Sequence, residues 1–279
     1  VMSDWGAVND RVEGLKAGLD LEMPSSNGIN DAEIVKAVQE GTLDEAVLDQ
    51  AVERILKIVF EYLDNKKEQP LTLEQDHEFA QHAAEESIVL LKNEENILPL
   101  KEKEQVAFIG GFVKNPRYQG GGSSHVNPFK VTSAWDALSS KENITYAEGF
   151  SAETDVYDEK LTAEAIETAK QADKAIIFAG LPESFESEGY DRKHMHLPEC
   201  QNKLIAEIAK VQPNTIVVLH NGAAVEMPWV NEVKGLVEAY LGGQAVGQAI
   251  VNILYGMVNP SGKLAETFPI KLEDNPSYL

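Results

Sequence analysis

The sequence predicts an α/β fold built around a mostly parallel sheet. From about residue 106 onward, short apolar runs that end in glycine or turn residues alternate with segments of helical periodicity. This alternation is typical of strands connected by helices that cover both faces of a sheet. Ligands of such sheets gather at the carboxyl ends of the strands, so functional side chains are expected there.

The chain is predicted to start irregularly and then to form a short helix. Residues 1–30 are rich in Gly, Asp, Asn and Ser. Helical spacing follows, and Asn30 or Asp31 is a suitable cap for a helix that reaches about Glu40. Gly41 is expected to end this helix.

A long amphipathic helix is predicted next. Thr42 and Glu45 have the spacing of a capping box at a helix start. Apolar residues then recur at helical intervals over 44–64. The polar run 66–70 predicts a linker.

The rest of the chain is expected to begin with a helix over 73–92 and to continue as strands and helices in alternation. The predicted strands are VAFIGGF (106–112), ITYAEGF (144–150), KAIIFAGL (174–181), NTIVVLHNG (214–222) and GLVEAYLGG (235–243). The predicted later helices span 161–172, 198–211 and 244–256.

Composition limits the function classes. The 279 residues suffice for one large domain or two modest ones. A formal net charge of −22 argues against a nucleic-acid partner, which needs basic patches, but leaves neutral sugars open. No apolar run of about 18 residues is present, so no membrane span is predicted. The single cysteine, Cys200, provides neither an internal disulfide nor a metal cluster.

A cytoplasmic location is expected, with secretion left open. The chain starts without a basic, apolar leader. Because Val1 is not a natural start, the true amino terminus is expected to lie upstream. One thiol is compatible with a reducing compartment and does not require it.

Nucleotide and metal sites are disfavoured. FIGGF lacks the third glycine of a dinucleotide-binding motif. GMVNPSGK (256–263) has five residues between its outer glycines where a phosphate loop has four, and Leu264 stands where Ser or Thr should hold magnesium. His194 and His196 lie two apart without a third ligand, so a metal role is disfavoured.

Two loops are candidates for a functional site. GGGSSH, residues 120–125 and called the glycine loop below, is either a flexible surface loop or a wall of a site at a domain junction. It lacks the G-x-S-x-G pattern of a serine hydrolase. FESEGYDR, residues 185–192 and called the acidic loop below, directly follows a predicted strand. Its carboxylates are Glu186, Glu188 and Asp191, and its place at a strand end favours function over a merely solvated surface.

A second carboxylate has a similar setting. Asp4 follows VMS, a plausible strand end, and Trp5 offers a flat ring on which a sugar could stack. Two carboxylates on opposite sides of a bound sugar are the minimum machinery for cleaving a glycosidic bond. Asp4 together with an acidic-loop carboxylate therefore predicts a glycosidase.

The residues resemble glycoside hydrolase family 3, which includes β-glucosidases and β-xylosidases. The resemblance is carried by SDWGAV, AGLDLEMP (17–24), AEESIVLLKNEENILPL (84–100), FESEGYDR and NPSGKLAETFP (259–269), in the order of the family. It covers essentially the whole chain. Members without a sandwich domain take their acid/base from a barrel loop, so SEGYDR argues against that branch.

The resemblance implies two domains. Residues 1–70 are expected to be the last strands and helices of a (β/α)8 barrel plus a linker, and 71–279 an α/β sandwich truncated at its carboxyl end. Six barrel strands are then missing from this stretch. Since an open barrel exposes unpaired edges, the piece alone is expected to be nearly inactive, and the missing barrel half is a required partner.

The resemblance also implies the mechanism. Asp4 matches the nucleophile and Glu188 the acid/base of a retaining double displacement, for which no cofactor is required. Asp191 and Arg192 are expected to order the acidic loop, with a salt link to Glu186 as one arrangement. The residues expected near the sugar are Trp5, Gly121, Gly122 and Ser123.

The expected substrate is a β-glucoside or an oligosaccharide with terminal β-D-glucose. A β-xylosidase of the same family and a non-catalytic carbohydrate-binding piece are the alternatives. No nucleic-acid or membrane partner is expected, and the oligomeric state is left open, a homo-oligomer included.

Overall fold

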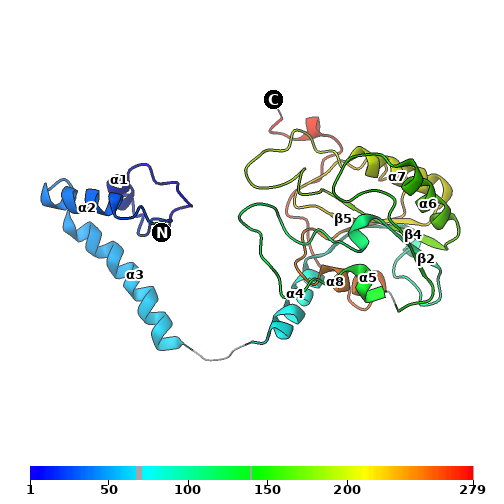
Figure 1. The fold of residues 1–279 in the computed structure, drawn as a ribbon, viewed down its shortest axis with the longest axis horizontal. Helices are drawn as coiled ribbons and strands as arrows, with labels where there is room; N and C mark the ends of the chain where they lie inside the picture. The colour runs from blue at the N-terminus through cyan, green and yellow to red at the C-terminus, as the bar shows by residue number, and fades with distance from the viewer. Residues whose placement is uncertain (67–70, 139, 279) are drawn as a thin grey trace. The chain divides into compact units, whose positions relative to one another are not determined.

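The computed structural model describes residues 1–66, 71–138 and 140–278. The chain divides into two compact units, Val1–Pro70 and Leu71–Leu279 (Figure 1). Of the linker predicted over 66–70, all but the first residue lie outside the described residues. Among the described residues, no helix has both the length and the apolar character needed to cross a membrane.

Residues 1–66, the described part of the first unit, contain three helices. They are α1 (Arg11–Lys16), α2 (Ile29–Gln39) and α3 (Glu45–Asn65). The short α1 falls in the stretch predicted to be irregular, and its start is capped by the side chain of Asp10. A small core of Leu15, Ile34, Ala37, Leu43 and Ala51 holds the three helices together.

Two predictions about helix starts in this unit, the cap at Asn30 or Asp31 and the capping box at Thr42, are wrong. The cap of α2 is Gly28, whose φ of 88° suits glycine, and neither Asn30 nor Asp31 caps it. Thr42 does not open a capping box, because its hydroxyl donates back to the carbonyl of Ala37 at 3.1 Å. Asp44 caps α3 instead, accepting from the amide of Ala46 at 3.0 Å.

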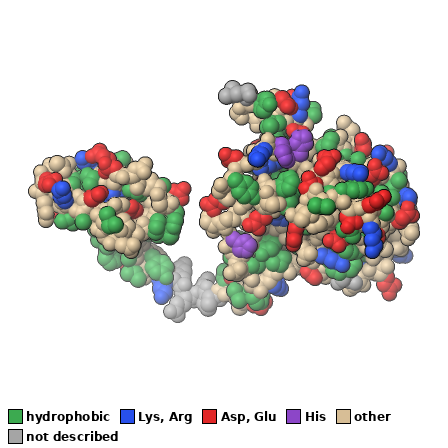
Figure 2. Space-filling view, turned by 45° about the horizontal axis from the view of Figure 1, so that its top comes forward, with side chains coloured by type: hydrophobic (Ala, Val, Ile, Leu, Met, Phe, Trp, Pro, Cys, Tyr) green, Lys and Arg blue, Asp and Glu red, His purple; other side chains and the backbone are tan. Residues whose placement is uncertain are grey.

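Helix α3 matches the predicted span of 44–64 within a residue at each end. Ala51 is its one buried residue within this unit. Several of its large apolar side chains are exposed, and green side chains of this unit are visible in Figure 2. They are Val52, Leu56, Ile58, Val59, Phe60 and Leu63.

The second unit is built on a six-stranded sheet with the order β1-β6-β5-β4-β2-β3. All neighbours pair in parallel except β1 and β6, which are antiparallel. The strands are β1 (Val89–Asn93), β2 (Val106–Ile109), β3 (Ile144–Ala147), β4 (Lys174–Gly180), β5 (Thr215–His220) and β6 (Gly235–Glu238). The predicted α/β fold with a mostly parallel sheet is confirmed.

Helices cover both faces of this sheet (Figure 1). One layer contains α6 and α7, which contact each other, and the other contains α4, α5 and α8. Strands β2, β4, β5 and β6 are buried along their whole length, as expected between two helical layers. The helices are α4 (Leu73–Ser87), α5 (Ala134–Leu138), α6 (Glu159–Lys170), α7 (Glu199–Val211) and α8 (Val246–Leu254).

The helix predicted over 73–92 is too long at its carboxyl end. It stops at Ser87, and the next residues form the edge strand β1. Pairing with β6 satisfies the backbone groups along one side of this strand, and Ile88 at the junction is fully buried. Tertiary pairing therefore overrides the helical spacing of the apolar residues.

The five predicted strands are all present, but each is shorter at its carboxyl end than the sequence pattern indicates. The run predicted over 174–181, for example, ends at Gly180, and the run over 214–222 ends at His220. The residues beyond these ends belong to the loops that form the candidate site.

Candidate active site

Three loops of the second unit meet at the carboxyl ends of neighbouring parallel strands. The glycine loop lies in the connection after β2, the acidic loop follows β4, and Asn221 and Gly222 follow β5. Since β4 pairs with both β2 and β5, these loops leave the same edge of the sheet side by side. This edge is where open α/β sheets bind ligands.

Glu188 of the acidic loop is in direct contact with the glycine loop. Its Oε2 accepts hydrogen bonds from the amide of Ser123 at 2.5 Å and from the Ser123 hydroxyl. The amide of Glu188 donates to the carbonyl of Gly121 at 3.4 Å. Four residues predicted for the site, Gly121, Gly122, Ser123 and Glu188, are thus brought together, while their roles stay predictions.

The contact fixes the preferred charge of Glu188. The hydrogen bonds from Ser123, first its hydroxyl and then its amide, lower the pKa of the Glu188 carboxyl, and slight desolvation opposes them. The side chain is exposed. In this conformation Glu188 is therefore a carboxylate near neutral pH.

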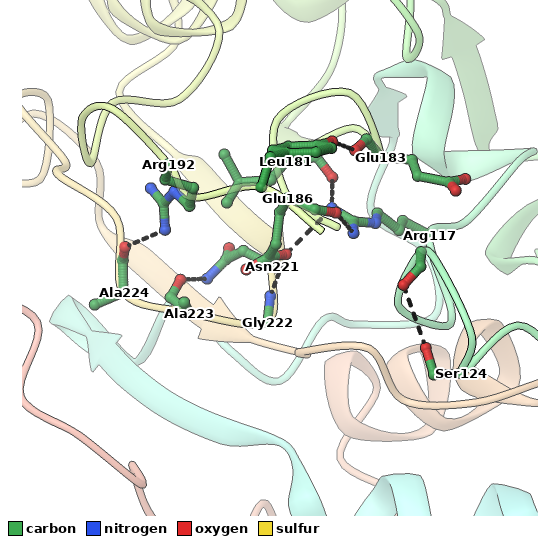
Figure 3. Close-up of polar contacts among 12 residues, drawn as sticks. Arg117, Ser124, Leu181, Glu183, Glu186, Arg192, Asn221, Gly222, Ala223 and Ala224 are labelled. Atoms are coloured by element: carbon green, nitrogen blue, oxygen red, sulfur yellow. Dashed lines mark hydrogen bonds and ion pairs between the residues drawn. The ribbon is translucent and has the colours of Figure 1, made fainter. Parts of the chain in front are cut away.

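Arg117 anchors the base of the acidic loop, as the close-up in Figure 3 shows. Its Nη1 donates to the carbonyl of Leu181 and lies 3.2 Å from Oε2 of Glu186, and its Nη2 donates to the carbonyl of Glu186 at 2.6 Å. The side chain is buried, and this burial lowers its pKa against the opposing effect of Glu186. The same Glu186 oxygen accepts from the amide of Gly222 at 2.9 Å.

This anchor differs from the expected one. Among the described residues, the ion-pair partner of Glu186 is Arg117 and not Arg192. Arg192 instead donates from Nη1 to the carbonyl of Ala224 at 2.9 Å (Figure 3). It thus links the end of the acidic loop to the segment after β5, and the expectation that it orders the loop holds in this form.

Sequence reasoning did not single out Arg117. The residue lies between the end of β2 and the glycine loop, in NPRYQGGG. An arginine close to a glycine-rich loop and across from three carboxylates is a weak signal, because no spacing ties it to one of them. Only the pairing of β2 with β4 brings it to Glu186.

A buried carboxyl lies at the end of β6. Glu238 is fully buried, accepts from Asn221 Nδ2 at 3.0 Å and from the amide of Tyr240 at 2.8 Å. Burial raises its pKa to about 8 against these two hydrogen bonds. Glu238 is therefore largely protonated at neutral pH, and no pattern in the sequence marks it as a buried carboxyl.

In the first unit, Asp4 and Trp5 follow a short extended segment. Met2 forms a parallel bridge with Leu21, and the Ser3 hydroxyl accepts from the amide of Met23 at 2.8 Å. Asp4 Oδ1 accepts from the amide of Trp5 at 2.6 Å, and the Trp5 side chain is 71% exposed. Both side chains are therefore accessible on this unit.

Arg11 supports this segment by binding the residues just before Leu21, the bridge partner of Met2. It is buried, and its guanidinium donates to the carbonyls of Leu19 at 2.9 Å and Asp20 at 3.1 Å. Asp20 in turn binds Arg54, whose hydrogen bond is the main cause that lowers the pKa of Asp20 to about 2. Arg11 was also not predicted, because it stands in a stretch expected to be irregular, where no pattern marks it as a buried charge.

The histidine pair and the GMVNPSGK segment have the following surroundings in the structure. His196 lies 3.6 Å from Glu226, and within residues 1–66, 71–138 and 140–278 no group of three or more His, Cys, Asp or Glu side chains could hold a metal. Gly256 follows α8 rather than a strand, and Lys263 Nζ donates to the carbonyl of Ser261 at 2.9 Å. This segment has neither the position nor the free lysine of a phosphate loop.

Comparison with known families identifies the second unit. Residues 88–279 match the model of the glycosyl hydrolase family 3 C-terminal domain. The chain belongs to glycosyl hydrolase family 3. The acidic loop, the glycine loop and β1 to β6 all lie within the matched residues of this family 3 chain.

Known relatives of this family 3 chain cover its whole length. It is 56% identical to thermostable beta-glucosidase B of Acetivibrio thermocellus, over 100% of this chain and 38% of the relative. It is 41% identical to an exo-alpha-(1->6)-L-arabinopyranosidase of Bifidobacterium longum, again over 100% of this chain and 38% of the relative. The chain therefore spans well under half the length of these relatives.

A solved structure agrees in fold. The crystal structure of a GH3 beta-glucosidase from Bifidobacterium adolescentis superposes with a TM-score of 0.92 at 42% sequence identity. The superposition covers 99% of this chain and 41% of that one. The family 3 chain thus shares the fold of the corresponding part of this β-glucosidase.

Proposed function

We propose that this chain carries both catalytic carboxylates of a retaining β-glucosidase. Glu188 is the acid/base and Asp4 the nucleophile, and the substrate is a β-glucoside or an oligosaccharide with terminal β-D-glucose. The observation that carries the proposal is the 56% identity to thermostable beta-glucosidase B over the whole chain, which includes both carboxylates.

The structure supports the assignment of Glu188 over its neighbours. Glu186 is bound by Arg117 and by the amide of Gly222, so it serves to fix the loop. The side chain of Glu188 is exposed, and among the described residues its carboxylate accepts hydrogen bonds from Ser123 alone. A proton donor must be free to approach the leaving oxygen, which suits Glu188 and not Glu186.

The reaction we propose has two steps. Asp4 attacks the anomeric carbon while Glu188 protonates the leaving oxygen, and a glycosyl ester on Asp4 forms. Glu188, now a carboxylate, takes a proton from water, which opens the ester and regenerates Asp4. Retaining enzymes hold such carboxyl groups about 5–5.5 Å apart.

We further propose that the first unit is part of a barrel whose remaining strands are needed for activity. The parallel bridge between Met2 and Leu21, with α1 between them, is the pattern of successive barrel strands. The exposed apolar face of α3 offers a surface for packing. Asp4 would then stand at the carboxyl end of a barrel strand, where barrel enzymes carry their active sites.

A second substrate is favoured by one observation. The relative from Bifidobacterium longum, at 41% identity, is named for an α-L-arabinopyranoside. The higher identity to the β-glucosidase makes the β-glucoside our first choice. Comparing kcat/KM for aryl β-D-glucoside, aryl β-D-xyloside and aryl α-L-arabinopyranoside in the full-length protein would rank the three.

The test of the acid/base assignment is azide rescue of Glu188→Ala in the full-length protein. We expect loss of turnover on an aryl β-glucoside, with partial recovery when azide, a nucleophile that needs no general base, attacks the glycosyl ester in place of water and releases a glucosyl azide. Glu183→Gln, which removes a charge just before the acidic loop, is the matched control. Unchanged turnover in Glu188→Ala would instead favour a carbohydrate-binding role for the loop.

A further inference from the structure

One oxygen of Glu188 is held by a single residue of the glycine loop. Ser123 donates to it from both the backbone amide, at 2.5 Å, and the side-chain hydroxyl. The amide of Glu188 returns a weaker bond to the carbonyl of Gly121 at 3.4 Å. The two loops therefore close on each other around the carboxylate.

The glycines at this contact leave the space that the contact needs. A Cβ on Gly122 would lie 2.5 Å from Cβ and 2.7 Å from Oε2 of Glu188, and Gly122 has a φ of 88°. A Cβ on Gly121 would lie 2.5 Å from Oγ of Ser187. Gly122 does not tolerate a side chain while Glu188 stays where it is, so the loop is shaped to Glu188 at this position, while Gly121 leaves room for Ser187.

Other charges on these loops do not account for the contact. The acidic-loop side carries Glu183, Glu186, Asp191 and Arg192, and the glycine-loop side carries Arg117 and His125. Arg117 and Glu186 are paired with each other. The causes that lower the pKa of Glu188 are the two Ser123 hydrogen bonds and none of these charges.

We propose that residues 121–123 form a clamp that holds the Glu188 side chain in this conformation between catalytic cycles, with Ser123 as the positioning residue. The inference deepens the proposed function and rests on it. Two donors on one oxygen bind a carboxylate better than a carboxylic acid, so the clamp stabilises the ionised form. Glu188 is released when it takes up the proton that it later gives to the leaving oxygen.

The clamp acts on the two steps in opposite ways. The first step needs protonated Glu188, so a clamp that favours the carboxylate brings the alkaline limb of kcat/KM to lower pH. The second step needs the carboxylate as a base, which the clamp favours. Weakening the clamp should therefore extend activity to higher pH on substrates whose leaving group needs a proton.

The test compares pH profiles of kcat/KM for Ser123→Ala and wild type in the full-length protein. On an aryl glucoside with a poor leaving group, we expect the alkaline limb of Ser123→Ala to move to higher pH. Ser123→Thr, which keeps the hydroxyl, should restore the wild-type limb. On a dinitrophenyl glucoside, which leaves without a proton, the variant and wild type should have the same profile.

Matched controls separate the clamp from general loop damage. Ser124→Ala changes the neighbouring serine, whose hydroxyl donates to the carbonyl of Gly121 at 3.5 Å and does not bind Glu188. The alkaline limb of kcat/KM for this variant should therefore stay at the wild-type pH. Gly122→Ala should move the limb in the same direction as Ser123→Ala. Gly243 has a similar φ of 80°, but an added Cβ there would meet open space. Gly243→Ala should therefore leave the alkaline limb of kcat/KM in place.

The outcomes are distinct for the clamp and for the proposed function. An unmoved alkaline limb in both Ser123→Ala and Gly122→Ala, with Glu188→Ala still rescued by azide, overturns the clamp and leaves the acid/base assignment intact. A limb that moves equally in Ser124→Ala also overturns it. Failure of azide rescue overturns the proposed function, and the clamp with it.

Discussion

Arg117 binds Glu186 twice, at its carboxylate and at its main-chain carbonyl. Nη1 lies 3.2 Å from Oε2, and Nη2 lies 2.6 Å from the carbonyl oxygen. Both side chains are mostly removed from water, with exposed fractions of 7% and 17%. One arginine from the β2 side thus fixes the start of the loop that carries Glu188.

We predict that Arg117→Met destabilises the second unit by about 2 kcal/mol, because it leaves the partly buried Glu186 carboxylate without its cation. Denaturant unfolding of the full chain measures this. The double variant Arg117→Met, Glu186→Gln should recover part of the loss. Lys170→Met, which breaks an exposed pair with Glu167 on α6, should cost less than about 1 kcal/mol. Equal losses for the two single variants would contradict the anchor.

Glu238 predicts a pH dependence of stability. Its pKa is near 8 in the folded protein and near 4.5 in the unfolded chain, so the folded state binds more protons between these values. The unfolding free energy should therefore fall as pH rises through this window, by up to about 1.4 kcal/mol per pH unit from this group, and level off above pH 8.

The variant Glu238→Gln isolates this effect, because a neutral amide has no proton to lose. Its unfolding free energy should change less than that of wild type between pH 5 and pH 8, and Glu207→Gln on the exposed side of α7 should behave like wild type. Chemical denaturation at a series of pH values is the measurement. Parallel curves for wild type and Glu238→Gln would show that Glu238 is ionised throughout.

Trp5 should contribute to sugar binding and not to the stability of the fold. Its side chain is 71% exposed, so Trp5→Ala should change the unfolding free energy by less than about 0.5 kcal/mol. If the ring stacks on a sugar, kcat/KM for an aryl β-glucoside should fall about ten-fold in the full-length protein. Phe79→Ala, at a comparable 73% exposure on α4, serves as control. Equal kinetics for the two variants would remove Trp5 from the site.

Most elements of the second unit could be predicted from sequence because they depend on local patterns. Apolar runs ending in glycine marked β2 and β4, and helical spacing marked α6 and α7 within two residues at either end. The error at β1 has a physical cause: its residues have helical spacing, and only the distant β6 makes them a strand. In the first unit, the predicted capping box at Thr42 failed for a local reason, because the Thr42 hydroxyl donates back to the carbonyl of Ala37.

The candidate site could be predicted in part. The acidic and glycine loops were found separately, from composition and from their place after strands, and the structure joins them through Ser123 and Glu188. Arg117 and Glu238 could not be found, because their importance lies in burial and in partners far along the chain. A sequence shows that a charge exists but not that the fold removes it from water.

One experiment decides whether Asp4 is the nucleophile. A 2-fluoro-β-glucoside with a good leaving group traps the glycosyl ester, since the fluorine slows both steps while the activated leaving group speeds up only the first. The full-length protein would be inactivated with this reagent, digested, and the labelled peptide sequenced by mass spectrometry. We predict one label, on Asp4, and no label in Asp4→Asn. A label on another carboxylate, Glu186 or Glu188 included, would contradict the assignment.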